Sequence, residues 1–409
     1  MKYGEVKMKY SKDEVLQYVA EEDVKFIRLA FCDVFGKQKN ISIMPEELPR
    51  AFEYGIAFDA SAVAGFGDES RSDLFLHPDP ATLTWLPWRP EHGTVVRMFC
   101  SISYSDGSPF ACDTRTLLKR AVEDAKAAGF AFYFGAEQEF YLFELDEKNE
   151  PTKIPYDRAG YMDIAPEDKG ENVRREICLT LEQMGIHPES SHHEEGPGQN
   201  EIDFRYTDAL CAADNVLTFQ TVVRTVARRN GLAADFSPKP LDAAPGNGFH
   251  VNWSAKPDDE KKQGQMIAGV LAKIVPMTVF LNPSEESYKR LGQMKAPRFV
   301  SWSRENRSQL VRIPAAEKEY RRAELRSPDP AANPYITFTL LIRAALHGIG
   351  NGLPLPAPVD CNLYRADEKT MAALEKLPET LAEAKAAAKA DEWIKGCLPK
   401  EILSIYCKA

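Results

Sequence analysis

Acidic and apolar residues alternate in the segment Glu201-Ile202-Asp203-Phe204, and Arg205 continues the pattern. Successive side chains of a β-strand point to opposite faces, so Glu201, Asp203 and Arg205 are expected to share one face. The apolar residues on the other face can pack on a hydrophobic core. The charged face must meet water, cations or a ligand, and it is therefore the first candidate for chemistry.

Three further segments show the same split between a polar and an apolar face. Their polar positions, each two residues apart, are Glu137 and Glu139; His250, Asn252 and Ser254; and Arg322, Glu324 and Arg326. One such segment is ordinary in a sheet with a solvated face. Four of them are less ordinary, and they indicate that the polar faces line a common cavity.

In such a cavity the glutamates, joined by Glu194 and His250, would repel one another by several kcal/mol at an effective dielectric constant of about 20. Either their pKa values rise or cations neutralise them. Oxygen ligands with a single imidazole suit Mg²⁺ or Mn²⁺. Arginines are close in the sequence, at Arg304, Arg307 and Arg312. Two or more hard cations beside several arginines would equip a site for phosphoryl transfer from a nucleotide.

The composition narrows the classes of partner. A chain of 409 residues with a net charge of −10 and a pI near 5.4 is not expected to bind nucleic acid or an anionic membrane. Its eight cysteines are scattered without a CxxC pair, which is typical of reduced cytoplasmic thiols. The first residues form no apolar signal segment. The apolar stretch 266–281 is interrupted by Lys273 and Pro276 and is too short to span a bilayer. We expect a soluble, cytoplasmic protein.

Local patterns predict two domains. Strands over 24–31, 40–43 and 95–102, the first two joined by a hairpin in which Asp33 is a turn residue, indicate a small β-rich domain over residues 1–105. Asp113 is a good N-cap for a helix closed by Gly129. The remainder, residues 106–409, is predicted to be one large α+β domain. Its further helical patterns lie near 171–184, 207–230, 260–275 and 334–349, and in the tail from 377 to 393.

Together these segments resemble the glutamine synthetase family, because six blocks correspond in order. They are Phe31-Cys32-Asp33-Val34-Phe35-Gly36-Lys37; Phe58-Asp59-Ala60-Ser61; Glu137-Gln138-Glu139-Phe140; His192-His193-Glu194 with Gly198-Gln199-Asn200-Glu201-Ile202; Gly248-Phe249-His250; and Asn306-Arg307-Ser308 through Arg322-Ala323-Glu324-Leu325-Arg326-Ser327-Pro328-Asp329. The resemblance covers nearly the whole chain, fades after Tyr364, and is closest to the type I branch of bacteria and archaea.

The resemblance implies an α+β fold with a small β-grasp-like N-terminal domain and a large catalytic domain. In the catalytic domain of this family a curved antiparallel sheet lines the active site. Twelve subunits form two stacked rings, and each active site lies between neighbours. ATP phosphorylates the side-chain carboxylate of glutamate, and ammonia then displaces phosphate from γ-glutamyl phosphate.

The same resemblance assigns roles to individual residues. Two or three Mg²⁺ or Mn²⁺ ions are implied, one held by Glu139, Glu194 and Glu201 and a second by Glu137, His250 and Glu324. Glutamate would be bound by Arg290, Arg326 and Gly246, and the nucleotide by Glu189, Asn252, Ser254 and Arg322. Arg307 and Arg312 would neutralise the transferred phosphoryl group, and Asp59 would bind ammonium and take its proton. His192 and His193 lie outside the strand face and are expected to play supporting roles.

Three departures from the family pattern concern the amine and amino-acid end of the site. Lys295 stands at the glutamate position of the mobile flap, Ala62 stands where a serine is usual, and Pro245 replaces the asparagine before Gly246. Lysine offers no acceptor at neutral pH, and alanine leaves room. These changes keep two alternatives open: a ligase that joins glutamate to a larger amine (a polyamine, an alkylamine or ethanolamine), and a catalytically weak regulatory or assembly subunit.

Overall fold

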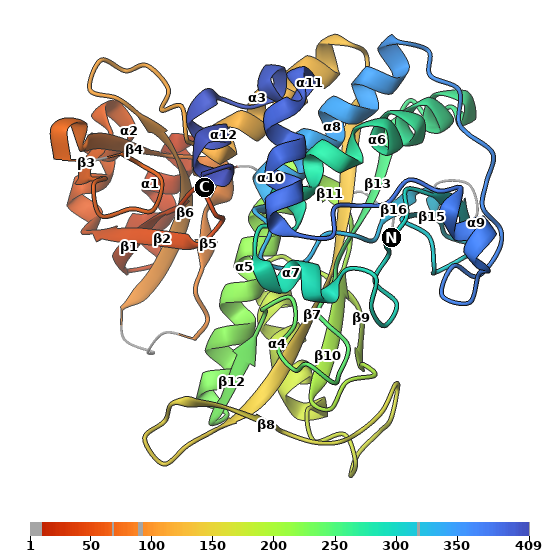
Figure 1. Ribbon diagram of the computed structural model, residues 1–409. Helices are drawn as coiled ribbons and strands as arrows, with labels where there is room; N and C mark the ends of the chain where they lie inside the picture. Colours follow the sequence, from red (N-terminus) through yellow and green to blue (C-terminus); the bar gives the residue numbers. More distant parts are fainter. Residues whose placement is uncertain (1–9, 68, 89–92, 317–319, 409) are drawn as a thin grey trace. The chain divides into compact units, whose positions relative to one another are not determined.

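The computed structural model describes residues 10–67, 69–88, 93–316 and 320–408 (Figure 1). The chain divides into two compact units. The first contains Met1–Thr116 and Thr180–Ile186, and the second contains Leu117–Leu179 and His187–Ala409. Strands and helices occur in both units, so the predicted α+β class is confirmed.

The first unit is built on a sheet in the order β2-β1-β6-β4-β3, with β5 paired to β6. Strands β1 and β2 form the predicted antiparallel hairpin. In its turn, the Asp33 carboxylate accepts the N–H groups of Phe35 and Lys37 at 3.0 and 2.9 Å. The elements are α1 (Lys12–Glu21), β1 (Val24–Cys32), β2 (Gln38–Ile43), η1 (Pro45–Glu47), α2 (Leu48–Tyr54), β3 (Ile56–Asp59), η2 (Glu69–Arg71), β4 (Asp73–Pro78), η3 (Pro80–Thr82), β5 (Thr84–Trp85) and β6 (Thr94–Ser103).

The second unit is built on a ten-stranded, mostly antiparallel sheet around the long strand β7 (Figure 1). The order is β14-β15-β16-β13-β7-β10-β9, and β8, β11 and β12 also pair with β7. The strands are β7 (Ala131–Leu145), β8 (Pro151–Pro155), β9 (Pro188–His193), β10 (Gln199–Phe204), β11 (Thr207–Asp208), β12 (Leu232–Asp235), β13 (Phe249–Lys256), β14 (Trp302–Arg304), β15 (Val311–Ile313) and β16 (Ala323–Leu325).

The two faces of this sheet differ in chemistry, because side chains alternate along β7. Phe134 stacks on Phe338 of helix α8 with ring centroids 4.3 Å apart, and Phe140 contacts Phe219 of helix α5. Helices therefore cover the face that carries these phenylalanines. Glu137 and Glu139 project to the opposite face, as the alternation predicts.

Helices α6 and α8 pack closely where two glycines meet. A Cβ on Gly269 would lie 2.1 Å from the carbonyl oxygen of Ala344, and one on Gly348 would lie 1.9 Å from that of Gln265. Any side chain at either position would force the helices apart. By length and composition alone, helix α6 could cross a membrane. However, 72% of its most apolar stretch is buried inside the protein, as expected for a core helix.

The predicted helices are present, with shifted ends. Helix α6 continues six residues past the predicted end at residue 275 and runs through Pro276. The tail is helical only from residue 381, and its helix breaks at Asp391, which caps the next one. The helices are α3 (Thr114–Ala127), α4 (Glu171–Gln183), α5 (Ala209–Arg229), α6 (Glu260–Leu281), α7 (Glu285–Arg290), α8 (Pro334–Gly350), α9 (Glu368–Ala372), α10 (Leu381–Ala390), α11 (Glu392–Cys397) and α12 (Lys400–Tyr406).

Candidate active site

The register of the sheet brings the four predicted polar faces together. Strands β16, β13, β7 and β10 are consecutive neighbours, although they are far apart in the sequence. Across these strands the paired residues are Glu324 with Asn252, His250 with Glu137, Asp203 with Glu137, and Glu201 with Glu139. Arg205 is an exception to the predicted face, because β10 ends at Phe204 and Arg205 is exposed.

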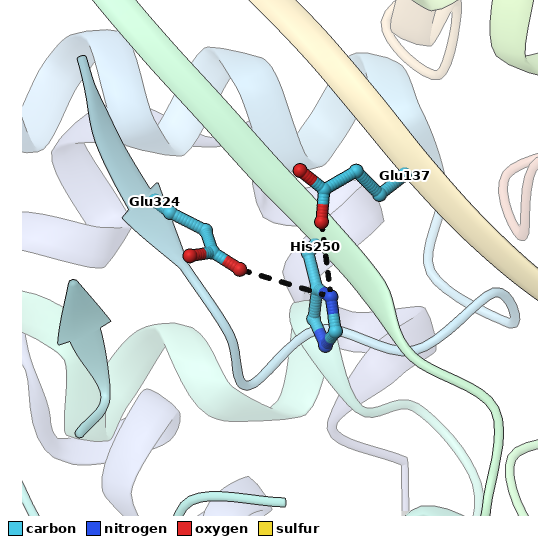
Figure 2. Close-up of side chains that lie close together, drawn as sticks. All are labelled: Glu137, His250 and Glu324. Carbon is cyan, nitrogen blue, oxygen red and sulfur yellow. Dashed lines mark hydrogen bonds and ion pairs between the residues drawn. The ribbon is translucent and has the colours of Figure 1, made fainter. Parts of the chain in front are cut away.

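One group of ligand atoms consists of Glu137, His250 and Glu324, whose side chains converge in Figure 2. The Nδ1 atom of His250 lies 3.3 Å from Oε2 of Glu137 and 3.8 Å from Oε1 of Glu324. Three neighbouring strands supply one side chain each. A set of two carboxylates and one imidazole can hold a divalent cation.

Two arginines hold the buried Glu324 side chain. Arg312 pairs with its Oε2, and Nη1 of Arg326 lies 2.7 Å from its Oε1. Asn252 links Glu137 to Arg322, since its Nδ2 donates to Glu137 at 2.7 Å and its Oδ1 accepts from Arg322 at 2.8 Å. The site therefore places guanidinium groups directly beside a cluster of carboxylates.

A second group of carboxylates surrounds Glu201. In one group, ligand atoms of Glu201, Glu139 and His250 lie within 4.8 Å of one another. In a separate group, those of Glu201, His192 and Glu194 do so. The Oε2 atom of Glu139 accepts the Gly248 N–H at 2.7 Å. Glu201 thus connects the predicted ligands Glu139 and Glu194. The division of these residues between two ions remains a prediction.

Neighbouring acids of the cluster have pKa values shifted in opposite directions. Burial opposes ionisation of Glu137, but hydrogen bonds from His250 and Asn252 outweigh it and hold its pKa at about 2. Burial and the nearby carboxylates raise the pKa of Glu201 well above its usual range, and burial together with Glu137 raises that of Asp203 to about 7. Not all of these acids can be ionised together unless positive charge is added.

The donor set fits hard divalent cations. It consists of carboxylates and one or two imidazoles, without thiolates, among the described residues. The buried Oδ1 atom of Asp203 has no hydrogen-bond partner in the described part of the chain, although Oδ2 accepts from Ser190. A cation would neutralise the acids without protonating them, which is the chemistry expected of Mg²⁺ or Mn²⁺.

The predicted glutamate-binding residues meet beside this cluster. Arg290 is 3% exposed, and its Nη1 donates to the Ser327 carbonyl at 2.8 Å. A Cβ on Gly246 would lie 2.9 Å from Cγ of Arg290 and 2.4 Å from the Pro238 carbonyl oxygen. Because Gly246 has no side chain, Arg290 can occupy the space beside it.

The loop before Gly246 is held by a tyrosine. The hydroxyl of Tyr141, on β7, donates to the Pro245 carbonyl at 2.6 Å. Gln199 contacts the same loop, because its Nε2 lies 3.3 Å from the Gly246 carbonyl and 3.1 Å from Oε2 of Glu139. Pro245, which lacks an N–H, is thus fixed through its carbonyl.

Lys295, which the resemblance places in the family's flap, forms an ion pair with Glu195. Its ammonium also lies 5.6 Å from the ring centroid of Tyr161, within the range of a cation–π contact. Lys295 has a φ of 71°, and Met294 before it has a φ of 36°, so the flap turns sharply here. The lysine contacts the segment that carries Glu194.

The remaining predicted residues are not among the groups of ligand atoms described above. Asp59 ends β3 in the first unit, where hydrogen bonds from Ser61 lower its pKa, and Ala62 is exposed nearby in the sequence. Glu189 is exposed on β9, and Arg307 is exposed in the turn before β15. Ser254 lies on β13, two positions beyond Asn252. Their roles remain predictions.

Sequence reasoning underestimated three side chains at the site. His192 lies opposite Glu201 in the register, and its Nε2 is 2.9 Å from Glu194. Gln199 and Tyr141, described above, also contact the cluster or its loop. Gln199 shares the strand face of Glu201, so the same alternation could have found it. Tyr141 lies on the same strand face as Glu139, but its hydrogen-bond partner is a backbone carbonyl, which no side-chain pattern reveals.

Comparisons with known proteins agree with this arrangement. The family description "Glutamine synthetase, beta-Grasp domain" matches residues 23–105, and "Glutamine synthetase, catalytic domain" matches residues 111–409. The chain is 43% identical to a glutamine synthetase of Clostridium saccharobutylicum, covering 97% of this chain and 94% of the relative. It is 42% identical to one of Methanosarcina mazei, covering 97% and 92%.

A solved structure described as "GmaS/ADP complex-Conformation 1" has a similar fold. The TM-score is 0.86 at 28% identity, and the match covers 96% of this chain and 93% of the other. Two family descriptions together span most of the chain, and relatives above 40% identity cover nearly its full length. The carboxylate-lined sheet with adjacent arginines agrees with both. The chain belongs to the glutamine synthetase family.

Proposed function

We propose that this protein is an ATP-dependent ligase that forms glutamine from glutamate and ammonia through γ-glutamyl phosphate. The observation that carries the proposal is the convergence of Glu137, His250 and Glu324, on adjacent strands, with Arg312 and Arg326. Family membership supports the same reaction, because enzymes of this family use ATP and divalent cations. The proposed ligands are Glu137, His250 and Glu324 for one ion and Glu139, Glu194 and Glu201 for another, and the site would hold two or three Mg²⁺ or Mn²⁺ ions.

Bound divalent cations would supply positive charge for the phosphates of ATP. Arg312 and Arg307 are proposed to add charge beside the phosphoryl group as it leaves the nucleotide and bonds to a side-chain oxygen of glutamate. That oxygen later departs with phosphate. A carboxylate oxygen is a poor leaving group, whereas phosphate leaves readily when the amine nitrogen attacks the acyl carbon.

Arg290, Arg326 and Gly246 are proposed to bind the amino-acid end of glutamate. Arg326 is 3% exposed, and its Nε has no hydrogen-bond partner among the described residues. A buried guanidinium donor without an acceptor is costly, and a substrate carboxylate would satisfy it in the planar geometry that arginine favours. Glu189, Asn252, Ser254 and Arg322 are proposed to contact the nucleotide.

Asp59 is proposed to bind ammonium and take its proton. It lies on the unit that, in the proposed dodecamer, would face the active site of a neighbouring subunit. The hydrogen bonds from Ser61 lower the pKa of its carboxyl group, and an acceptor for ammonium must be ionised. We also propose a cytoplasmic location.

The test is release of phosphate from ATP by the purified protein with glutamate, ammonium and Mg²⁺, accompanied by formation of glutamine in equal amount. Omission of either glutamate or ammonium should abolish release. No turnover over a wide ammonium range would reject the proposal. The same assay with ethanolamine, an alkylamine and a polyamine measures whether the changes at Ala62 and Lys295 favour a larger amine; the relatives above 40% identity do not favour that outcome.

A further inference from the structure

A buried polar network lies behind the turn that joins β9 to β10. Its members are Asp157, Asp168, Arg174 and His193, each no more than 5% exposed. None of them has a role in the proposed chemistry. The turn, however, carries Glu194 and leads into Glu201, two of the proposed metal ligands.

His193 is the last residue of β9 and uses both nitrogens of its ring. Nε2 lies 2.8 Å from Oδ1 of Asp157, and Nδ1 lies 2.6 Å from the carbonyl oxygen of Glu194. A carboxylate and a carbonyl are both acceptors, so both nitrogens donate. The imidazole therefore ties the backbone of Glu194 to Asp157.

Asp157 holds the other end of the turn as well. Its Oδ1 accepts the Gly198 N–H at 3.0 Å, and its Oδ2 accepts the Lys169 N–H at 3.1 Å. One buried carboxylate thus contacts the chain on both sides of the turn, through His193 before it and Gly198 after it. The spacing between Glu194, in the turn, and Glu201, on β10, depends on these contacts.

Arg174, in the first turn of α4, supports the second strand. Its Nη1 donates to Oδ1 of Asn200 at 2.7 Å, and Nδ2 of Asn200 donates to the Gly198 carbonyl at 2.9 Å. Arg174 is itself paired with Asp168. Asn200 directly precedes Glu201, so the network reaches the backbone next to both proposed ligands.

The network has the residue types of a metal site, since ligand atoms of Asp157, Asp168 and His193 lie within 4.8 Å of one another. Its electrostatics differ from those of the acidic cluster. Backbone N–H groups, Arg174 and His193 already contact the oxygens of the two aspartates. A network whose carboxylates are already hydrogen-bonded and paired does not require a cation, and it is better suited to fixing the turn.

We infer that Asp157 and His193 are positioning residues that set the relative placement of Glu194 and Glu201. This inference rests on the proposed function, because it assumes that these glutamates bind a divalent cation. Side chains that orient metal ligands typically contribute 10- to 100-fold to metal affinity. The ion held by Glu194 and Glu201 should depend on the network, whereas the ion held by Glu137, His250 and Glu324 should not.

The test is a direct titration with Mn²⁺ in the absence of nucleotide. The concentration of free Mn²⁺ is measured at each step from its electron paramagnetic resonance signal. Asp157→Asn and His193→Gln should each weaken one class of Mn²⁺ sites by about 10- to 100-fold and leave the other class unchanged. Tyr335→Phe is the matched control. It removes a buried 2.6 Å hydrogen bond to Asp214 in the same unit and should leave both classes unchanged.

The outcomes separate the inference from the proposed function. Wild-type protein that binds no Mn²⁺ would overturn both. If the wild-type protein binds Mn²⁺ and both variants bind it equally well, the inference alone is overturned. It is also overturned if both classes of Mn²⁺ sites weaken equally and the Tm falls, because that result indicates general destabilisation. If neither variant folds, Asn200→Ala provides the same test, because it breaks the link from Arg174 to Gly198 without touching Asp157.

Discussion

The two ends of the proposed active site are built in different ways. At the carboxylate end, Glu324 is fully buried on a central strand, and each of its oxygens is paired with an arginine. At the flap end, Lys295 and Glu195 pair on loops, with their side chains 53% and 39% exposed. Exposed pairs contribute at most about 1 kcal/mol, whereas breaking a buried pair costs several times more.

The difference indicates where the chain can change and where it cannot. Phosphoryl transfer needs charges fixed in place before the reaction, and the strands supply this rigidity. In the family pattern the flap end would meet the amine, and this chain departs from that pattern at Lys295; Pro245 is a departure in the loop before Gly246, and Ala62 is a departure in the first unit. Substitutions should therefore have graded effects, from very large at the carboxylate end to small at the flap.

The largest effect is expected for Glu324→Gln. The amide keeps the size of the side chain but removes the charge that pairs with Arg312 and Arg326 and that would bind a cation. We expect kcat to fall by at least about 10³-fold, measured by phosphate release. The same substitution at the other end, Glu195→Gln, is the control and should change kcat by less than about fivefold. Equal losses in the two variants would contradict the comparison.

The second-largest effect is expected on removal of divalent cations. Chelation should abolish turnover, and restoring Mg²⁺ or Mn²⁺ should recover it. Because Glu137, Glu201 and Asp203 repel one another, saturating Mn²⁺ should also raise the Tm; a ligand at 100 times its Kd adds about 2.7 kcal/mol to the free energy of unfolding. A thermal scan with and without Mn²⁺ measures this. An equal rise in Glu324→Gln would show that the ion binds elsewhere.

A moderate effect is expected for Tyr141→Phe. The variant loses the hydrogen bond from the hydroxyl to the Pro245 carbonyl, which is worth about 1 kcal/mol, so the loop before Gly246 should be less well fixed. We expect the KM for glutamate to rise about fivefold with little change in kcat. Tyr206→Phe removes an exposed hydroxyl and should leave KM unchanged. A fall in kcat without a change in KM would place the effect of Tyr141 elsewhere.

The smallest effect is expected for Lys295→Glu. If a flap carboxylate is what the amine pocket lacks, activity with ammonium should rise, by about two- to fivefold given the small energy of an exposed pair. Lys295→Gln removes the ion pair without supplying a carboxylate and serves as the control. The result to look for is the difference between the two variants at subsaturating ammonium. An equal or lower rate in Lys295→Glu would mean that the flap works in another way.

Much of the site could be predicted from the sequence, because it follows from the two-residue period of β-strands. The alternation of Glu137 with Gln138 and of Glu201 with Ile202 predicted which side chains share a face, and the structure confirms both. The hairpin at Asp33 and the helix capped by Asp113 were predictable for a similar reason, since turns and caps depend on neighbouring residues.

Tertiary structure alone decided which strands are neighbours and which distant groups meet. No local pattern shows that β13 lies between β7 and β16, or that Arg312 reaches Glu324. Asp157 and His193 are 36 positions apart, and their contact depends on how the chain returns past the sheet. Local periodicity determines the direction of a side chain, whereas its partners depend on packing and register across the whole sheet.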